Sequence, residues 1–290
     1  MRRILRRLDV ALDSAGAAEM ALQPTNGREA AIEMFLSSID ITEPGMALYF
    51  QQHRQRIART LSILPLGSPG SRALELGSYL HMAAALQRVL DYSIVRAAYY
   101  APSVGRNTAS LPIRGQQPFT TDLDLFDAES HVYPYLDSSF DLVLCCELIE
   151  HLLHDPMHML LECWRVLSDG GRLVITTSNA ACLTSVWAAL DGRHNPQVFS
   201  RYPAKGNPDV PHVREYTPHE IGEAVRSAGF QIEALFAERM EGTDHATWVL
   251  DILKANGFET ARRGEQIYCV GRKQMPAATL DRFPEFLYSR

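Results

Sequence analysis

Short apolar runs of strand length alternate with amphipathic helical stretches over most of the chain. Runs of the first kind lie at 73–76, 93–97, 123–126, 140–146, 173–177, 232–236 and 266–270. Helical periodicity is found near 80–90, at 156–167, after Thr217 and around 245–256. Because strands that alternate with helices are typical of parallel strands joined by crossover helices, the pattern predicts an α/β fold built on a layered sheet.

Two further helices precede the sheet and form a helical prefix at 28–66. Apolar residues recur there in two stripes of helical spacing, Ile32, Phe35, Leu36 and Ile39, and then Met46, Tyr49, Phe50, Ile57 and Leu61. The connection at 180–216 is long and rich in polar and aromatic residues, as substrate lids often are. We expect five segments: an arm and linker at 1–27, the prefix or cap at 28–66, the main domain at 67–272, the lid insertion at 180–216 inside it, and an apolar tail at 273–290.

The first residues combine a leucine face with arginines. Leu5, Leu8 and Leu12 share one helical face, and four arginines surround it. Because the basic run is short, we favour an arm that docks on the body or pairs two copies in a homo-oligomer over a helix on a membrane surface. Asp9 and Asp13 interrupt the apolar run that a signal peptide needs, and no later run reaches transmembrane length, so no membrane span is expected.

The composition is that of a globular protein with a mildly acidic balance. The chain has 28 Lys and Arg against 34 Asp and Glu, which gives a net charge of −6. A nucleic-acid surface needs a dominating basic face, so nucleic acid is an unfavourable partner. The five cysteines lie in apolar stretches without zinc-type spacing, which indicates reduced, buried thiols and a cytoplasmic location.

Acidic residues end three of the predicted strands. Glu75 lies at the end of the first, Asp127 and Glu129 follow the third, and Glu147 follows the fourth. In an open parallel sheet the ligand lies beyond the carboxyl ends of the strands, where these acids suit a ligand with amino or hydroxyl donors. A phosphate-rich ligand would need glycine amides and cations instead, and neither GxxxxGK[ST] nor GxGxxG is present, so ATP and NAD are poor candidates.

Six short motifs recur in the order and at the spacing of a known family. They are Leu74–Gly77, Asp127–Glu129, Ser139–Val143, Glu147–His151, Arg165–Gly171 and Leu173–Asn179. Together they resemble the successive motifs of class I S-adenosylmethionine-dependent methyltransferases over residues 70–272. The resemblance implies a Rossmann-like, seven-stranded, mostly parallel sheet of the class I methyltransferase type behind the helical N-terminal prefix.

The resemblance also implies where the cofactor S-adenosyl-L-methionine binds. The residues concerned are Glu75, Gly77, Ser78, Tyr79, Asp127, Ala128 and Glu147. In the family, residues at the positions of Glu75 and Gly77 hold the methionine end of the cofactor. The residues matching Asp127 and Ala128 read adenine, the carboxylate accepting from the amino group and the backbone N–H donating to the ring. Glu147 stands on the methyl side.

Two positions depart from the family pattern. The loop from Gly77 to His81 reads GSYLH where the family usually has GxGxG, so two glycines that let the backbone approach the ligand are replaced. The acid that normally ends the second strand and grips the ribose hydroxyls is absent, and AAYY occupies 97–100. These departures motivate an alternative, a catalytically degenerate methyltransferase fold that serves as an interaction protein.

The fourth predicted strand runs into the sequence ELIEH, which ends at His151. Residues three and four apart share one helical face, so Glu147, Glu150 and His151 are expected to point together into the crevice. They suit a divalent-metal half-site, a general base with orienting acids, or charges that complement the helix N-terminus. His212 lies in a segment that resembles small-RNA 2′-O-methyltransferases, which implies Glu147, Glu150, His151 and His212 as ligands for Mg or Mn.

The leading hypothesis is an S-adenosylmethionine-dependent methyltransferase that O-methylates a small-molecule acceptor with hydroxyl groups, such as a sugar or a natural-product intermediate. The reaction needs a positioned acceptor and removal of its hydroxyl proton, for which His151 and Glu150 are the catalytic candidates. The alternatives are the degenerate interaction protein and a metal-dependent RNA 2′-O-methyltransferase. The last rests on the Glu/His set, and the acidic net charge counts against it.

Overall fold

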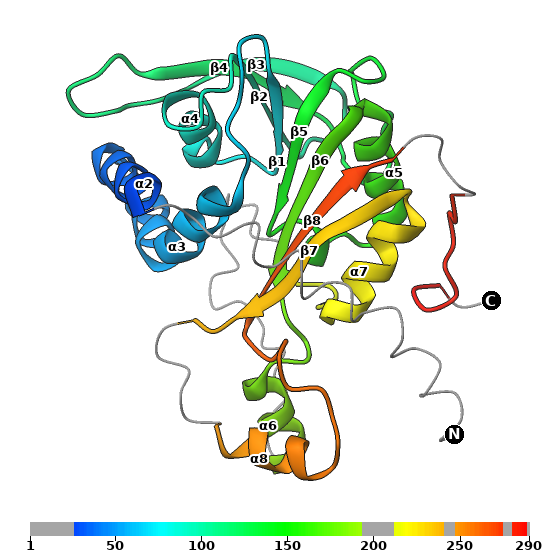
Figure 1. The fold of residues 1–290 in the computed structure, drawn as a ribbon. Coiled ribbons are helices and arrows are strands. Elements are labelled where there is room, and N and C mark those ends of the chain that lie inside the picture. Colours follow the sequence, from blue (N-terminus) through cyan, green and yellow to red (C-terminus); the bar gives the residue numbers. More distant parts are fainter. Residues whose placement is uncertain (1–25, 193–211, 241–246, 275–279, 289–290) are drawn as a thin grey trace.

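The computed structural model describes residues 26–192, 212–240, 247–274 and 280–288 and shows one twisted sheet flanked by helices (Figure 1). Its strands in these ranges are β1 (Arg72–Leu76), β2 (Ile94–Tyr99), β3 (Gly105–Leu111), β4 (Phe119–Leu125), β5 (Phe140–Cys146), β6 (Leu167–Ser178), β7 (Phe230–Glu238) and β8 (Gln266–Lys273). Their order across the sheet is β3-β4-β2-β1-β5-β6-β8-β7. Strands β4, β2, β1, β5 and β6 pair parallel, whereas β3 and β8 run antiparallel to their neighbours. The predicted α/β fold with a mostly parallel sheet is therefore confirmed.

The described sheet has eight strands, one more than the seven that the sequence predicts. The additional strand is β3, which pairs with β4 and forms one edge. Its residues, GRNTASL, are mostly exposed and show no apolar alternation. Hydrophobic periodicity therefore carries no signal for this strand.

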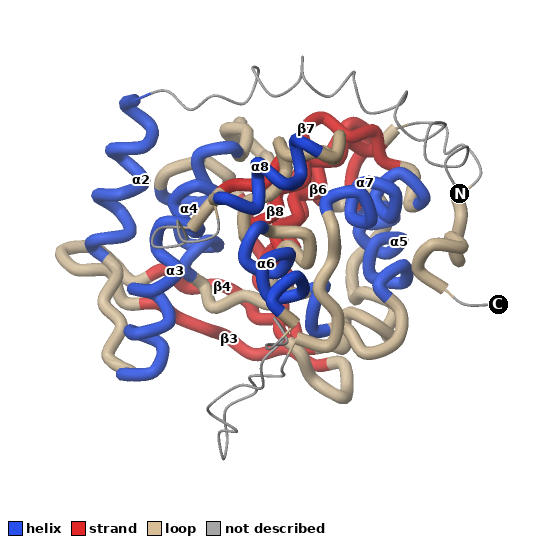
Figure 2. The backbone as a smooth tube through the Cα atoms, turned by 90° about the horizontal axis from the view of Figure 1, so that it is seen from below, coloured by secondary structure: helices blue, strands red, loops and turns tan. Residues whose placement is uncertain are grey.

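Helices cover both faces of the sheet. The described helices are α2 (Asn26–Ser38), α3 (Pro44–Ile63), α4 (His81–Arg88), the short 3-10 helix η4 (Ile149–His151), α5 (Pro156–Val166), α6 (Leu183–Asp191), α7 (Pro218–Ser227) and α8 (Trp248–Ala255), of which five lie on the sheet. One face packs against α2, α3 and α4, and the other against α5 and α7 (Figure 2). Successive residues of β1 alternate between the two cores, with Ala73 in the first and Leu74 in the second.

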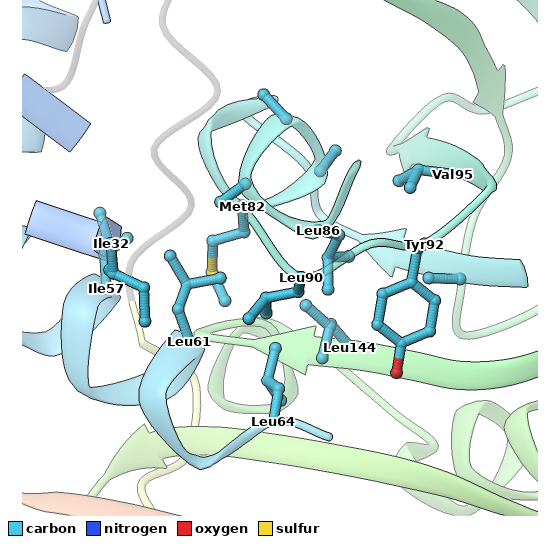
Figure 3. Packing of buried hydrophobic residues seen from close by; sticks show 14 of the residues in the cluster. Ile32, Ile57, Leu61, Leu64, Met82, Leu86, Leu90, Tyr92, Val95 and Leu144 are labelled. Carbon is cyan, nitrogen blue, oxygen red and sulfur yellow. The ribbon is translucent and has the colours of Figure 1, made fainter. Parts of the chain in front are cut away.

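The predicted prefix is part of the first core. Figure 3 shows Ile32 of α2, Leu61 of α3, Leu86 of α4 and Leu144 of β5 in one apolar cluster, and each is at most 1% exposed. Burying one such side chain contributes about 1.5–3 kcal/mol. The prefix is therefore anchored to the domain through its apolar stripes, and α3 is fixed beside the sheet.

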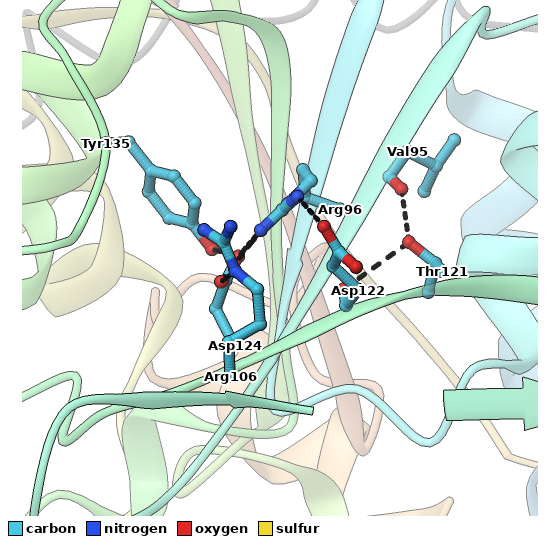
Figure 4. A network of polar contacts seen from close by, with 7 residues as sticks. All are labelled: Val95, Arg96, Arg106, Thr121, Asp122, Asp124 and Tyr135. Carbon is cyan, nitrogen blue, oxygen red and sulfur yellow. Dashed lines mark hydrogen bonds and ion pairs between the residues drawn. The ribbon is translucent and has the colours of Figure 1, made fainter. Parts of the chain in front are cut away.

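A buried carboxylate ties three strands together at the edge of the sheet (Figure 4). Asp124 of β4 is 1% exposed and accepts hydrogen bonds from Arg96 of β2, Arg106 of β3 and the hydroxyl of Tyr135, at donor–acceptor distances of 2.6–3.1 Å. A buried carboxylate needs such partners because it loses its hydration. The network holds the β3–β4 hairpin against β2 at the penultimate residue of β4.

Three predicted segments lie partly outside the described residues. They are the arm, of which 1–25 are not described, the insertion, of which 193–211 are not described, and the tail, of which 275–279 and 289–290 are not described. The described start of the insertion is α6, which packs against α8 through Leu183, Val249 and Leu253. Over the parts of the chain that the structure describes, no helix is both long and apolar enough to cross a bilayer.

Candidate functional site

A cavity of about 560 Å³ lies at the carboxyl ends of β1, β2, β4 and β5. Strand order reverses here, because β1 has β2 on one side and β5 on the other, and such a switch point is where open α/β sheets bind ligands. Helix α3 of the prefix closes one wall through Tyr49, Arg56, Ile57 and Thr60. Of the cofactor residues expected from sequence, all except Ser78 line this cavity.

The loop after β1 is organised around Glu75. This residue is 5% exposed, and its Oε2 accepts the Ser78 hydroxyl at 2.6 Å and the Ala83 N–H at 2.9 Å. Burial raises the pKa of the Glu75 carboxyl to about 7, although these two hydrogen bonds oppose the rise. Ser78 therefore holds Glu75 in place from behind the cavity wall. Gly77 has a φ of +66°, a backbone conformation that favours glycine.

Tyrosines stand where the family pattern has a glycine and an acid. The ring of Tyr79 lies between those of Tyr49 and Tyr99, at centroid distances of 5.3 Å and 5.9 Å. All three rings, with Tyr100, line the cavity. They form an aromatic wall that runs from α3 to the end of β2.

The turn after β4 brings Asp127 and Ala128 into the cavity wall. The Asp127 carboxylate accepts the Glu129 N–H at 2.9 Å and the Ser130 hydroxyl at 2.6 Å. Each oxygen keeps a second lone pair, so the carboxylate can still accept from a ligand. The turn is thus preset by its own hydrogen bonds, and it presents the side chain of Asp127 and the backbone of Ala128 together.

Glu129 has a supporting role that the sequence does not reveal. Its carboxylate accepts the successive backbone N–H groups of Leu153, His154 and Asp155. Leu153 and His154 line the cavity, and Asp155 begins α5 as its N-cap. Glu129 therefore positions the loop that brings Leu153 and His154 into the cavity wall.

The expectation that Glu147, Glu150 and His151 share one helical face is wrong. Glu147 has a φ of +50°, outside the helical region, and the following helix, η4, is a three-residue 3-10 turn. The Glu147 carboxylate accepts from Arg56 at 2.6 Å, and its other oxygen accepts from Thr176 at 2.8 Å and Gln266 at 2.7 Å. Its hydrogen bonds therefore go to the prefix, β6 and β8.

Glu150, His151 and His212 do come together. One potential ligand atom from each lies within 4.8 Å of the others, and the rings of His151 and His212 meet edge to face at 5.0 Å. The Glu150 side chain is fully buried, with Oε2 accepting the Thr177 hydroxyl at 2.8 Å and Oε1 without a partner among the described residues. Burial, and next the nearby charge of Glu147, raises the pKa of Glu150 to about 8. Only Glu147 of the expected metal set is missing from this group.

Arg56 and Tyr49 of α3 are site residues that the motif order did not supply. Arg56 is 8% exposed, donates to Glu147 and also donates to the Tyr49 hydroxyl at 3.0 Å. The two residues are seven apart, so Arg56 lies on the apolar stripe of the helix. A cation on a buried stripe is the sequence signal that would have identified it.

Residues 80–175 match a protein family described as Methyltransferase domain. An S-adenosylmethionine-dependent methyltransferase of Mycolicibacterium smegmatis is 33% identical over 34% of this chain and 32% of its own length. A ubiquinone biosynthesis O-methyltransferase of Thiobacillus denitrificans is 26% identical over 40% of this chain and 47% of its own. A malonyl-[acyl-carrier protein] O-methyltransferase of Methylococcus capsulatus is 24% identical over 76% and 72%. The chain thus spans about a third to a half of the length of the first two relatives.

Solved structures share the fold. A Haloferax volcanii methyltransferase in complex with the Trm112 methyltransferase activator superposes with a TM-score of 0.50 at 17% identity, over 77% of this chain and 90% of that one. A SAM-dependent methyltransferase of Archaeoglobus fulgidus also gives a TM-score of 0.50, at 12% identity over 80% and 100%. At these identities the likeness concerns the fold alone.

Proposed function

Because this chain carries a class I S-adenosylmethionine-dependent methyltransferase domain, we propose that it O-methylates a hydroxylated small molecule, such as a sugar or a natural-product intermediate. One observation carries the proposal. The cavity at the switch point gathers, from three separate strand ends, residues at positions that the family uses for its cofactor: Glu75, Gly77, Tyr79, Asp127, Ala128 and Glu147. The names of two relatives, both O-methyltransferases, favour oxygen as the methyl acceptor.

The residues present fit the cofactor. The cavity volume of about 560 Å³ lies within the range of small-molecule sites, roughly 300–1,000 Å³. Carboxylates at Glu75 and Asp127 offer acceptors to amino groups, and apolar side chains of Leu76, Phe126 and Leu148 line the space between. When bound, S-adenosylmethionine supplies a methyl group already activated for transfer, so the protein has to position the acceptor and take up its proton.

We assign the proton uptake to His151. It lines the cavity, and a carboxylate oxygen of the buried Glu150 lies within 4.8 Å of a nitrogen of its ring. Above its pKa of about 8, an ionised Glu150 would stabilise the imidazolium that forms when His151 accepts a hydroxyl proton. Glu150 is thus proposed as the positioning acid, with Thr177 orienting it through the hydroxyl hydrogen bond.

A divalent ion is the competing use of the same cluster. Glu150, His151 and His212 offer one carboxylate and two imidazoles, whereas Mg²⁺ prefers oxygen ligands. Mn²⁺ accepts such a mixed set more readily. Because Glu147 is committed to Arg56, the cluster lacks the second carboxylate that the resemblance implied. We therefore place proton transfer by His151 first and make metal dependence an outcome of the test.

The test uses purified protein, methyl-labelled S-adenosylmethionine, and a cell extract separated into small-molecule, RNA and protein fractions. The proposal expects label in the small-molecule fraction, in a linkage stable to acid and base as an O-methyl ether is, with and without EDTA. Label in RNA would support the RNA methyltransferase instead. No transfer to any fraction would support the interaction protein, and loss of transfer with EDTA would assign the cluster to a metal.

The proposed compartment and assembly follow from separate features. All five cysteines are free thiols, and four of them are buried, Cys146 being the exception, which supports a reducing, cytoplasmic setting.

Self-association through the 1–27 arm stays a prediction. Light scattering on the full chain and on a chain lacking the arm measures it directly, and an equal number of chains per particle in both would rule it out.

A further inference from the structure

The end of β2 lies between the two parts of the cavity that carry the predicted cofactor residues. Strand β2 stands between β1 and β4 in the sheet, and Tyr99 is its last residue. The Ser78 N–H donates to the Ala98 carbonyl at 2.9 Å, and the Phe126 N–H donates to the Tyr99 carbonyl at 3.1 Å. These bonds fix Tyr99 between the loop after β1 and the turn after β4.

The covalent structure of the cofactor determines which of its groups lies at the end of β2. Its ribose links adenine to the methionine part, so a cofactor held by Glu75 at β1 and by Asp127 at β4 has its ribose over the end of β2. Tyr99 lines the cavity there, with the Tyr79 ring beside it at an interplanar angle of 50°. Aromatic rings pack well against a sugar, but they lack the charged oxygens to which hydroxyl groups make their strongest hydrogen bonds.

The carboxylates that line the described cavity are placed elsewhere. They are Glu75, Asp127, Glu129 and Glu147. Glu129 holds three backbone N–H groups of the loop before α5, and Glu147 is bonded to Arg56, Thr176 and Gln266. Glu75 and Asp127 stand on the strands that flank β2. None of these four carboxylates therefore belongs to the end of β2.

We propose that this chain holds the ribose of its cofactor by packing against Tyr79 and Tyr99, without a carboxylate on the ribose hydroxyls. Tyr99 is then a specificity-determining residue of the cofactor site. The inference rests on the proposed function and adds to it a statement about which cofactors the site accepts. It follows that analogues lacking the 2′- or 3′-hydroxyl bind nearly as well as the parent.

The experiment compares S-adenosylhomocysteine with its 2′-deoxy and 3′-deoxy analogues by calorimetry on the unmodified full chain. We expect the dissociation constants to differ by less than about threefold. A loss of about tenfold or more for either analogue, the size expected when a hydrogen bond to a charged group is removed, overturns the inference and leaves the proposed function intact. Failure of S-adenosylhomocysteine itself to bind overturns both.

A substitution at Tyr99 tests the same inference by adding the missing carboxylate to the protein. Tyr99→Asp installs a carboxylate at the end of β2 and is expected to create a preference of about tenfold for the parent over the deoxy analogues. Tyr99→Asn is the matched control of equal size without the charge, and it should show no such preference. If Tyr99→Asp binds the parent and the analogues equally, Tyr99 does not face the ribose and the inference fails. The comparison on the unmodified chain stands even if both variants fold poorly.

Discussion

Arg56 of the prefix and Glu147 at the end of β5 form an ion pair of 2.6 Å, and their side chains are only 10% and 12% exposed. The pair joins residues that are 91 positions apart in the chain. It connects the helical cap to the sheet at the wall of the cavity, and it compensates a charge that would otherwise be buried alone. The position of the helical prefix and the charge balance of the cavity wall therefore depend on the same ion pair.

Breaking this pair should destabilise the protein strongly. Arg56→Ala leaves the Glu147 carboxylate buried without its cation, so we expect the free energy of unfolding to fall by about 3–5 kcal/mol, measured by urea denaturation. Arg56→Met combined with Glu147→Gln should recover a large part of the loss, because no charge is then left unpaired. Arg54→Ala breaks the exposed pair with Glu33 and should change stability by no more than about 1 kcal/mol. Equal losses for Arg54→Ala and Arg56→Ala would contradict the account.

Cofactor affinity should depend on pH through Glu75. Its pKa of about 7 means that the carboxyl is neutral below pH 7 and ionised above it. The ionised form binds a cationic amino group better, so S-adenosylhomocysteine should bind about tenfold more tightly at pH 7.5 than at pH 5.5. Glu75→Gln should remove this dependence, and a variant that keeps it would show that another group is responsible.

The raised pKa of Glu75 also affects folding. Between its ordinary value of 4.5 and about 7, the folded protein binds a proton that the unfolded chain releases. The Glu75 contribution to stability therefore declines as the pH rises through this window. Urea denaturation of the unmodified chain and of Glu75→Gln across pH 4.5–7.5 measures it. A difference between the two that does not vary with pH would contradict this sign.

His151→Ala should separate turnover from binding. Loss of a general base lowers turnover by about 100-fold or more, whereas the side chain contributes little to holding the cofactor. We expect the dissociation constant of S-adenosylhomocysteine to change by less than about twofold in the same variant. Parallel losses in turnover and affinity would assign His151 to binding rather than to proton transfer.

The tail should stabilise the start of α5. Arg282 and Tyr288 both bond the Asp155 carboxylate, which also caps the helix through the His158 N–H at 3.1 Å. Burial opposes the ionised form, but these hydrogen bonds outweigh it and lower the pKa of Asp155 to about 2. Arg282→Ala is expected to reduce the free energy of unfolding by about 1 kcal/mol, since the pair is partly exposed.

Lowering the pH should remove the stabilisation that the pair of Arg282 and Asp155 provides. Asp155 has a folded pKa below its ordinary value of 3.8, so its stabilisation is fully present above that pH and is lost as the pH falls toward 2. The difference in stability between the unmodified chain and Arg282→Ala should therefore shrink over this range. A difference that stays constant from pH 5 to pH 2.5 would show that the tail acts by packing alone.

The succession of the parallel strands along the chain and the acidic residues at their ends were predictable because each depends on local pattern. The apolar run before Glu75 and the turn at Asp127 are both encoded within a few residues. Glu147 was misplaced because its left-handed backbone, which no pattern of side-chain types records, turns it toward Arg56. Strand β3 was not predicted because four of its seven residues, Arg106, Asn107, Thr108 and Ser110, are polar, and the strand is held by pairing with β4.

The cluster of Glu150, His151 and His212 shows a second limit of prediction from sequence. The first two are neighbours in sequence, but His212 reaches them only because Val213 and Arg214 donate their backbone N–H groups to the Glu150 carbonyl, at 2.8 Å and 3.2 Å. Such tertiary pairing is invisible to spacing. The family resemblance placed His212 in the predicted metal set. The same resemblance placed Glu147 in that set, but the structure gives Glu147 other partners.

The central claim is that the switch-point cavity binds S-adenosylmethionine, and calorimetric titration with S-adenosylhomocysteine tests it most directly. We predict one binding site per chain, weakened about tenfold by Asp127→Ala and unchanged by Asp251→Ala on helix α8, which does not line the cavity. Absence of binding, or an affinity that Asp127→Ala leaves unchanged, would contradict the assignment of this cavity.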